Sequence, residues 1–497
     1  MKPILTENTL SQLSEFIASN LALNFPRDRW VDLERNIRIA ATEFGYTDIE
    51  EFIQHIIKSP LTHERMEILA ASLTIGETYF WREPHTFEAL EKVIIPEIVH
   101  HRLNGEKRIR IWSAGCSTGE EPYSIAIALR ETIPFIKDWN ISILATDINT
   151  RNLRKATAGE YGKWSFRGTP PWLKEKYFVQ KPNGRFEITP EIKSMVKFEY
   201  LNLAEDIYPS SLNDTNAMEV IYCRNVLMYF SQERFRQVAR GFYKSLVQGG
   251  YLLVSASELS LQNFPDFTPV NVQGMVLYKK TSEKIKNLRQ VSTTESSPEP
   301  SLLEFILEPE TNSESAKYQP QLVESEILKS VDIPTPIDTN YEKSLEYYLQ
   351  GRYKDAVETL HNKELNDKEQ ILLIRALANA GMLAEAIRAC EKGITKRKSD
   401  PRIHYLYATI LHENNQFDEA IASLKHAVYL DSNFVLAYYS LANIYKQLGN
   451  AKAAKRNYEI VVTILDKSNH EDILFESEGL TVGRFKEIIN ASLKARV

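Results

Sequence analysis

The first hundred residues carry apolar side chains at helical spacing. Leu10, Leu13 and Ile17 recur three or four positions apart, which places them on one face of a helix. Pro26 is suited to the first turn of a further helix, because its missing N–H would have no partner there anyway. This pattern predicts an all-α N-terminal domain over residues 1–100.

From residue 101 to 280 short apolar runs alternate with helical stretches. The runs cover 109–112, 141–145, 196–201, 220–223 and 251–254. Such an alternation is typical of a mostly parallel sheet with helices on its faces, and we expect an α/β domain here. The pattern is interrupted at about 158–195, where Asn183-Gly184 separates two short apolar runs and favours a β-hairpin. We expect this segment to be a small antiparallel β insertion.

The chain changes character twice beyond residue 280. Residues 281–339 lose periodicity and gain Ser, Thr, Glu and Pro, which predicts a disordered linker. Over 340–497 a glycine or asparagine precedes an alanine by five positions four times, starting at 351, 381, 415 and 449. The last two intervals are 34 residues long, the period of tetratricopeptide (TPR) repeats.

The repeated segment is therefore expected to be an α-helical TPR solenoid, whose last repeat is covered by the apolar tail from Asp472. Grooves in such repeats commonly bind peptides or helices, so we predict a protein partner or self-association through this module. Generic helical hairpins without a peptide-binding groove are the alternative.

Composition narrows the class of protein. The 497 residues carry a net charge of -6, which is not the basic balance of a dedicated nucleic-acid binder. Cys116, Cys223 and Cys390 lie far apart, in neither zinc nor disulfide spacing, so we expect no metal site and a reducing compartment. No run of about 18 apolar residues occurs, which indicates a cytoplasmic protein without membrane insertion.

A candidate ligand site follows the first run of the α/β domain. Gly115 and Gly119 allow the backbone to approach a ligand closely, as in Rossmann-like nucleotide sites. No lysine follows the second glycine, so this is not a phosphate loop. Glu120 and Glu121 at the start of the next helix would repel phosphates and suit a cationic ligand.

An acidic residue, Asp147, ends the second apolar run. A carboxylate at this place can accept hydrogen bonds from both ribose hydroxyls of an adenosine. S-adenosylmethionine has a ribose and a sulfonium cation but no phosphate, so it fits the site better than NAD. The alternative is that Asp147 only caps a helix.

Four separated motifs carry a resemblance to a known family. They are Thr78-Tyr-Phe-Trp-Arg82, Gly115 to Ser124, Asn202-Leu203 and the run from Cys223 to Phe230. From about residue 10 to 280 the chain resembles the chemoreceptor glutamate methyltransferases, the CheR family. The resemblance implies a class I methyltransferase that esterifies glutamate side chains of chemoreceptors in chemotaxis-like signal transduction, with S-adenosylhomocysteine as the second product.

The resemblance also implies which residues form the site. Those expected to bind the cofactor are Thr78, Arg82, Gly115, Glu121, Asp147, Asn202, Leu203, Arg224 and Asn225. Arg82 and Tyr229 are expected closest to the methyl group, as catalytic residues. The chain departs from the family at Gly76, where asparagine is frequent, and at 255–258, where Ser-Ala-Ser-Glu replaces Gly-His-Ser-Glu. Gly76 removes a side-chain contact to the cofactor.

Methyl transfer to a carboxylate needs no strong base, because the acceptor is already ionised at neutral pH. Positioning then dominates, and Arg82 is suited to hold a carboxylate bidentately, either that of the substrate or that of the cofactor. Tyr229 would orient Arg82 or line the path of the methyl group. A surface ion pair for Arg82 and plain packing for Tyr229 are the alternatives.

Substrate docking has two candidate surfaces. Arg27, Arg35 and Arg38 fall on one arc of the helix expected from Pro26, and acidic chemoreceptor helices could dock there. Interspersed acidic residues make solvated helix charge the alternative. The insertion resembles the β-subdomain that in some family members grips a peptide at the receptor C-terminus; simple packing is the alternative for its 164–167 stretch.

Two further functions stay open at this point. One is a methyltransferase of the same fold with another acceptor. The other is an adaptor whose TPR repeats carry the function while the front half binds S-adenosylmethionine without turnover. Retention of Arg82, Glu121, Asp147 and Tyr229 together argues against the adaptor.

Overall fold

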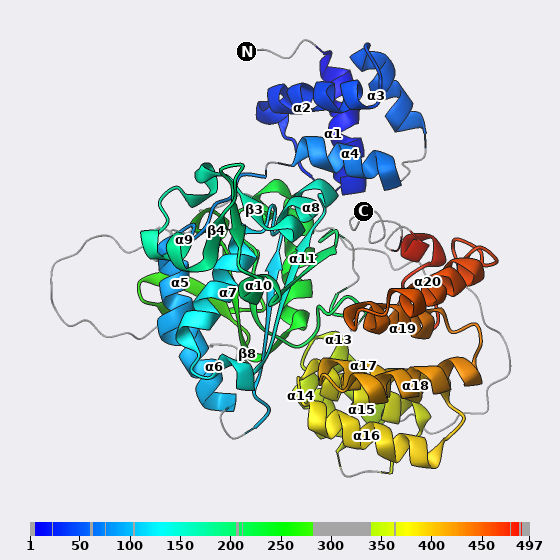
Figure 1. Ribbon diagram of the computed structural model, residues 1–497. Helices are drawn as coiled ribbons and strands as arrows, with labels where there is room; N and C mark the ends of the chain where they lie inside the picture. Colours follow the sequence, from blue (N-terminus) through cyan, green and yellow to red (C-terminus); the bar gives the residue numbers. More distant parts are fainter. Residues whose placement is uncertain are drawn as a thin grey trace, which may run out of the picture. The chain divides into compact units, whose positions relative to one another are not determined.

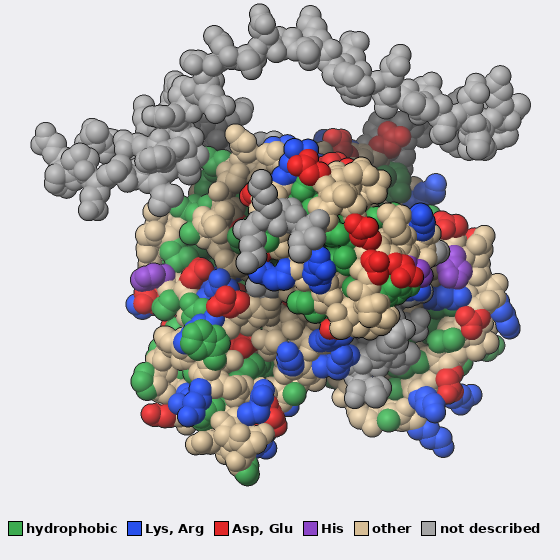
Figure 2. Space-filling view, turned by 90° about the horizontal axis from the view of Figure 1, so that it is seen from above, with side chains coloured by type: hydrophobic (Ala, Val, Ile, Leu, Met, Phe, Trp, Pro, Cys, Tyr) green, Lys and Arg blue, Asp and Glu red, His purple; other side chains and the backbone are tan. Residues whose placement is uncertain are grey.

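The computed structural model describes residues 5–281 and 339–489, apart from 22, 60–62, 75, 103–104, 205–207, 211, 362–363, 478 and 487–488. The predicted linker, 281–339, therefore lies outside the described residues except for its two ends. No helix within the described ranges is long and apolar enough to cross a membrane. On the face shown in Figure 2, basic and acidic side chains lie interspersed among hydrophobic ones.

The N-terminal part is helical, as the spacing of its apolar residues predicts (Figure 1). Its helices are α1 (Glu7–Leu21), α2 (Trp30–Glu43), α3 (Ile49–Lys58) and α4 (His63–Leu73). Leu10, Leu13 and Ile17 are fully buried and share one core cluster with residues of the other three helices. The expected helix from Pro26 begins instead at Trp30, because Arg27–Arg29 form a separate 3-10 turn, η1, after an extended Pro26.

The α/β domain contains a seven-stranded, mostly parallel sheet, in the order β6-β2-β1-β7-β8-β10-β9. The strands are β1 (Arg108–Ala114), β2 (Asn140–Asp147), β6 (Val196–Tyr200), β7 (Met218–Tyr222), β8 (Leu246–Leu253), β9 (Thr268–Val272) and β10 (Met275–Lys279). The first five strands in this order pair in parallel, and β10 is antiparallel to both β8 and β9. The predicted α/β fold is thus confirmed, and β9 and β10 are additions to the predicted strands.

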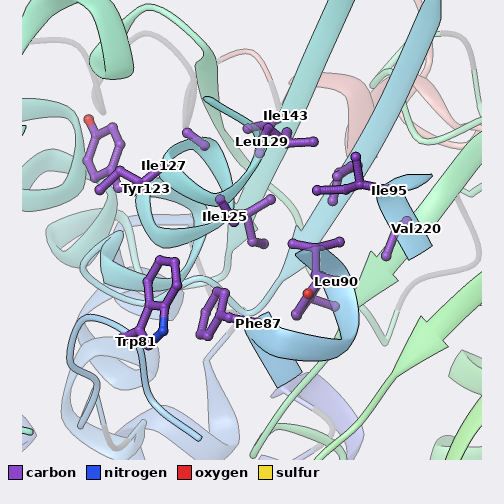
Figure 3. Close-up of a cluster of buried hydrophobic side chains, with 14 of the residues drawn as sticks. Trp81, Phe87, Leu90, Ile95, Tyr123, Ile125, Ile127, Leu129, Ile143 and Val220 are labelled. Atoms are coloured by element: carbon purple, nitrogen blue, oxygen red, sulfur yellow. The ribbon is translucent and has the colours of Figure 1, made fainter. Parts of the chain in front are cut away.

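Alternation along β1 fills two hydrophobic layers, one on each side of the sheet. Ile109 and Ile111 belong to a cluster under α5 (Pro84–Ala89), α6 (Ile95–Arg102) and α7 (Glu120–Thr132). Figure 3 shows Phe87, Leu90 and Ile125 of this layer pointing toward one another. Trp112 and Ala114 belong to the opposite layer, under α11 (Gln232–Ser245). Full burial of each large side chain contributes about 1.5–3 kcal/mol, which fixes the strands and therefore their carboxyl ends.

The insertion forms a separate antiparallel sheet in the order β3-β5-β4. It comprises β3 (Glu160–Tyr161), η4 (Lys163–Phe166), α9 (Pro171–Tyr177), β4 (Phe178–Gln180), β5 (Phe186–Ile188) and α10 (Pro190–Lys193), and it follows α8 (Thr150–Ala158). Gly184 turns the β4–β5 hairpin with a φ of 76°. The Asn-Gly pair therefore forms the hairpin that the sequence predicts.

Beyond the α/β domain, paired helices stack one after another (Figure 1). They are α13 (Thr339–Leu349), α14 (Tyr353–Leu360), α15 (Asp367–Asn379), α16 (Leu383–Lys396), α17 (Pro401–Glu413), α18 (Phe417–Leu430), α19 (Val435–Gln447) and α20 (Ala451–Leu465). The turn within each pair has a positive φ at Gly351, Gly381, Asn415 or Gly449. The alanine five positions later is buried in all four pairs, which lets the helices approach closely. The apolar residues of the tail pack on the last repeats.

Candidate functional site

An open cleft lies where the parallel strands β1, β2, β6 and β7 end. Its empty volume, including the open mouth, is about 1150 Å³. All ten residues expected around the cofactor and methyl group line it: Thr78, Arg82, Gly115, Glu121, Asp147, Asn202, Leu203, Arg224, Asn225 and Tyr229. The carboxyl edge of a parallel sheet is the usual place for a ligand in such folds, and the fold brings these distant residues together there.

The β1–α7 loop requires glycine for two different reasons. Gly115 has a φ of 81°, and a Cβ added there would lie 2.4 Å from Cγ2 of Val226. Gly119, with a φ of 92°, is the N-cap of α7, and its added Cβ would lie 2.8 Å from Cβ of Ala156. Gly115 thus permits contact with the opposite wall of the cleft, whereas Gly119 permits packing of α7 on α8.

Asp147 presents a carboxylate at the end of β2. Its Oδ2 accepts from the backbone N–H of Ser117 at 2.8 Å, and its Oδ1 accepts from that of Asn149 at 2.8 Å. Burial raises the pKa of Asp147, and these backbone N–H groups oppose the shift. Asn149 caps α8 by accepting from the N–H of Arg151 and Asn152, so the alternative that Asp147 caps this helix is wrong.

Glu121 and Arg224 join two walls of the cleft. Glu121 accepts from Oγ of Ser113 at 2.8 Å and from Nη1 of Arg224 at 3.3 Å. Arg224 also donates from Nη2 to the carbonyl oxygen of Arg82 at 2.7 Å. Burial raises the pKa of Glu121, and Arg224 opposes the shift. Glu120 lies away from the cleft and accepts from two hydroxyls, so only Glu121 can face a ligand there.

Arg82 and Tyr229 stand at the cleft with different surroundings. Arg82 donates from Nη1 to the carbonyl oxygen of Glu77 at 3.0 Å, and no carboxylate of the described residues forms an ion pair with it. Within the described ranges, Arg82 therefore does not form the surface ion pair that was the alternative to a role in the site. Tyr229 lines the cleft and also packs against the N-terminal helical core, with the guanidinium of Arg29 5.3 Å from its ring centre.

Glu258, which the sequence did not single out as a site residue, organises the 224–230 wall. Its buried carboxylate accepts from the backbone N–H of Val226 at 2.7 Å, Asn225 at 2.9 Å and Met228 at 3.3 Å. It also accepts from the N–H of Ser255 at 3.0 Å. The wall is irregular here, since Asn225 has a φ of 58°. One carboxylate thus replaces the regular hydrogen bonds that this loop lacks.

The insertion contacts the cleft through Arg167. Its guanidinium lies 4.1 Å from the ring centre of Tyr79 and 4.7 Å from that of Trp164, and Nη2 donates to Oε1 of Glu77 at 3.0 Å. In the backbone, the N–H of Phe80 donates to the carbonyl oxygen of Ser165 at 2.9 Å. The 164–167 stretch therefore packs on the segment that precedes Arg82.

The three arginines expected for docking do not share one helix. Arg27 lies on η1, the 3-10 turn that follows the extended Pro26 and precedes α2. Arg35 and Arg38 are on α2, where they pair with Asp32 at 2.8 Å and Glu34 at 2.6 Å. Two of the three charges are thus balanced within their own helix. The arrangement corrects the single arc predicted from the sequence.

Comparison with known proteins identifies the family. The family model described as "CheR methyltransferase, SAM binding domain" matches residues 76–275, and models described as "TPR repeat" and "Tetratricopeptide repeat" match 408–449 and 435–464. Among the described residues, no group of three or more His, Cys, Asp or Glu is placed to hold a metal ion.

Curated relatives agree with these matches. A chemotaxis protein methyltransferase of Borreliella burgdorferi is 33% identical over 51% of this chain and 89% of the relative. Chemotaxis protein methyltransferase 1 of Pseudomonas aeruginosa is 38% identical over 40% of this chain and 72% of the relative. The probable biofilm formation methyltransferase WspC of P. aeruginosa is 24% identical over 85% of this chain and 91% of the relative. The chain therefore belongs to the CheR family of S-adenosylmethionine-dependent methyltransferases and carries TPR repeats in its C-terminal part.

Proposed function

We propose that this protein transfers a methyl group from S-adenosylmethionine to glutamate side chains of a chemoreceptor-type protein and so forms methyl esters. The observation that carries the proposal is the convergence of ten family-expected residues on one cleft, with carboxylates inside it and Arg82 and Tyr229 also lining it. The relatives named chemotaxis protein methyltransferases support an acceptor that belongs to a chemotaxis system.

The donor groups suit S-adenosylmethionine. The Asp147 carboxylate lies at the carboxyl end of β2, where it would accept hydrogen bonds from the ribose hydroxyls. Gly115 adds no side chain to the lining of the cleft, which leaves room for the ligand. Glu121 places a second carboxylate in a cleft that would hold a cation. When bound, the cofactor supplies an electrophilic methyl group on a sulfonium. A phosphate-bearing ligand would meet both carboxylates and would be disfavoured.

The chain's own residues position the acceptor. A glutamate side chain is ionised at neutral pH, so its oxygen attacks in line without a general base. Arg82 would hold a carboxylate, because its remaining N–H groups have no carboxylate partner in the described residues and a guanidinium matches that shape. Tyr229 would line the methyl path on the side of the N-terminal helices. Fixing such a geometry can contribute as much as about 7–11 kcal/mol to lowering the barrier.

For the remaining parts of the chain we propose supporting roles. Residues 1–100 with Arg27, Arg35 and Arg38 would approach the acidic receptor helices, and the TPR repeats would bind a further protein partner or a second copy of this chain. The proposed place of action is the cytoplasm, where the methylated segments of chemoreceptors lie.

Two experiments test the proposal in separate steps. Calorimetry with S-adenosylhomocysteine on the wild type and on Asp147→Ala tests the cofactor site, and equal affinities would refute it. Incubation with labelled S-adenosylmethionine and a receptor cytoplasmic fragment tests the acceptor. A base-labile label indicates a carboxyl methyl ester, whereas a base-stable label would indicate another acceptor. Cofactor binding with no label on any protein would favour the adaptor function.

A further inference from the structure

The intra-repeat turns of the TPR module lie against the methyltransferase domain, one after another. A Cβ on Gly351 would lie 3.1 Å from Cα of Lys244, and a Cβ on Gly381 would lie 3.1 Å from Nη2 of Arg108. In the third repeat, the carbonyl oxygen of Glu413, two positions before the turn residue, accepts from Nδ2 of Asn140 at 3.2 Å. The turn positions that define the first three repeats in the sequence thus also contact the methyltransferase domain.

Glu413 is the centre of this contact surface. Its side chain, 4% exposed, pairs with Nη1 of Arg108 at 3.2 Å and Nη1 of Arg110 at 3.1 Å. Its Oε1 also accepts from Nδ2 of Asn216 at 2.7 Å. Glu413 ends α17, and a carboxylate at a helix C-terminus is unfavourable for the helix by itself. The position is explained by the two arginines that face it from β1.

The arginines depend on the repeats in return. Arg108 is 3% exposed and Arg110 is 5% exposed, and they project from the same face of β1. Burial lowers the pKa of Arg108, and Glu219 and Glu413 oppose that shift. Without Glu413, the described cluster of Arg102, Arg108 and Arg110 would retain the buried carboxylate of Glu219 and the half-buried carboxylate of Asp214 near Arg110. An uncompensated buried charge is strongly destabilising.

Two further contacts extend the surface on either side. Oε1 of Glu106 accepts from the backbone N–H of Ala384 at 2.9 Å, which places a carboxylate at the N-terminus of α16. Lys280 lies between two aromatic rings, 4.8 Å from the centre of Tyr243 and 4.9 Å from that of Tyr353 in α14. The contacts therefore span three successive helix pairs.

We propose that this row of turns is a docking edge, through which the TPR repeats and the methyltransferase domain form one folded unit independently of the covalent connection through 282–338. The edge meets the amino ends of β1 and β2, whereas the cofactor cleft lies at their carboxyl ends. A seven-residue strand spans about 23 Å. The docking edge thus lies about one strand length from the cofactor cleft, whose described lining contains no residue of the repeats.

The test uses the full chain with a protease site inserted between residues 283 and 339. After cleavage, the two wild-type fragments are expected to co-elute in size-exclusion chromatography. Glu413→Arg, which places a third cation beside Arg108 and Arg110, is expected to abolish co-elution. Glu459→Arg is the matched control, because Glu459 lies on α20 with a side chain 65% exposed, and its fragments are expected to co-elute.

A second variant covers the possibility that Glu413→Arg does not fold, as judged by circular dichroism. Glu413→Gln preserves the side-chain volume and an acceptor for Asn216, and it is expected to lower the melting temperature of the uncleaved chain by about 5 °C. Separation of the wild-type fragments after cleavage would overturn the proposal. Glu413 variants that co-elute and melt like the wild type would overturn it equally.

Discussion

Replacing Glu258 by glutamine tests whether one buried carboxylate fixes the wall of the cofactor cleft. In the wild type, Oε1 accepts from the N–H groups of Val226 and Met228, and Oε2 accepts from those of Asn225 and Ser255. Glutamine has the same shape but offers one carbonyl oxygen, and its amide N–H groups would face two of these donors. Whichever orientation it adopts, two backbone N–H groups lose their acceptor.

The magnitude follows from this count. Each buried donor left without an acceptor costs about 1–3 kcal/mol, so two cost about 2–6 kcal/mol. We expect the lower part of this range, about 2–4 kcal/mol of unfolding free energy, because water can reach the cleft and satisfy part of the loss. Since Asn225 and Arg224 line the cleft, loosening this wall is also expected to weaken S-adenosylhomocysteine binding about tenfold, equivalent to about 1.4 kcal/mol.

Urea unfolding measures the first quantity and calorimetry the second. Glu175→Gln is the matched control, because Glu175 is exposed on α9 and has no hydrogen bond to the cleft wall among the described residues. The control is expected to change stability by less than about 0.5 kcal/mol. If Glu258→Gln changed both stability and affinity as little as the control does, the positioning role derived from its hydrogen bonds would be refuted.

Three further predictions concern other groups. Gly115→Ala should weaken S-adenosylhomocysteine binding at least tenfold in calorimetry, because its φ of 81° and its approach to Val226 both oppose a side chain. Burial lowers the pKa of Lys280 to about 7. Between about pH 7 and 10.5 the Lys280 amine is therefore protonated in the unfolded chain but neutral in the folded one. The free energy of unfolding should rise with pH over this range by as much as about 1.4 kcal/mol per pH unit. Lys280→Met should remove this slope in unfolding titrations; an unchanged slope would contradict the shift. Burial raises the pKa of Asp147 and Glu121, so acidification from pH 7 toward 5 favours their neutral forms in the folded protein. This protonation should weaken S-adenosylmethionine binding and raise the free energy of unfolding of the unliganded protein. An affinity that stays constant from pH 7 to 5 would contradict this prediction.

Local patterns predicted much of the fold. Alternating runs located the five parallel strands, Asn183-Gly184 located the hairpin, and the 34-residue period located the TPR repeats. The antiparallel strands β9 and β10 were not predicted. For β10 the available signal was the apolar run 275–278 directly after the turn at Gly274, whereas β9 has apolar residues only at alternate positions. The start of α2 was placed too early, because Pro26 favours a helix start but does not indicate that the first turn after it is a 3-10 turn.

The candidate site was recovered mainly through motifs, because each motif is local although the residues meet only in the folded chain. Glu258 was missed as a site residue, since its hydrogen bonds reach backbone groups about 30 positions away and leave no pattern in side-chain spacing. The one available sign of a role for Glu258 was its position in the 255–258 run, which corresponds to a motif of the family. Glu413 and Arg108 are 305 positions apart, and a glutamate at a helix end was the only local indication of such a partner.

Mass-spectrometric mapping of the modified residue tests directly whether this protein methylates glutamate side chains. A chemoreceptor cytoplasmic fragment would be incubated with S-adenosylmethionine and either the wild type or Asp147→Ala, then digested and sequenced. We expect the mass of one added methyl group on glutamate side chains, lost under mild base and absent with the variant. A methyl group on lysine, arginine or another base-stable position, or equal modification by the variant, would contradict it.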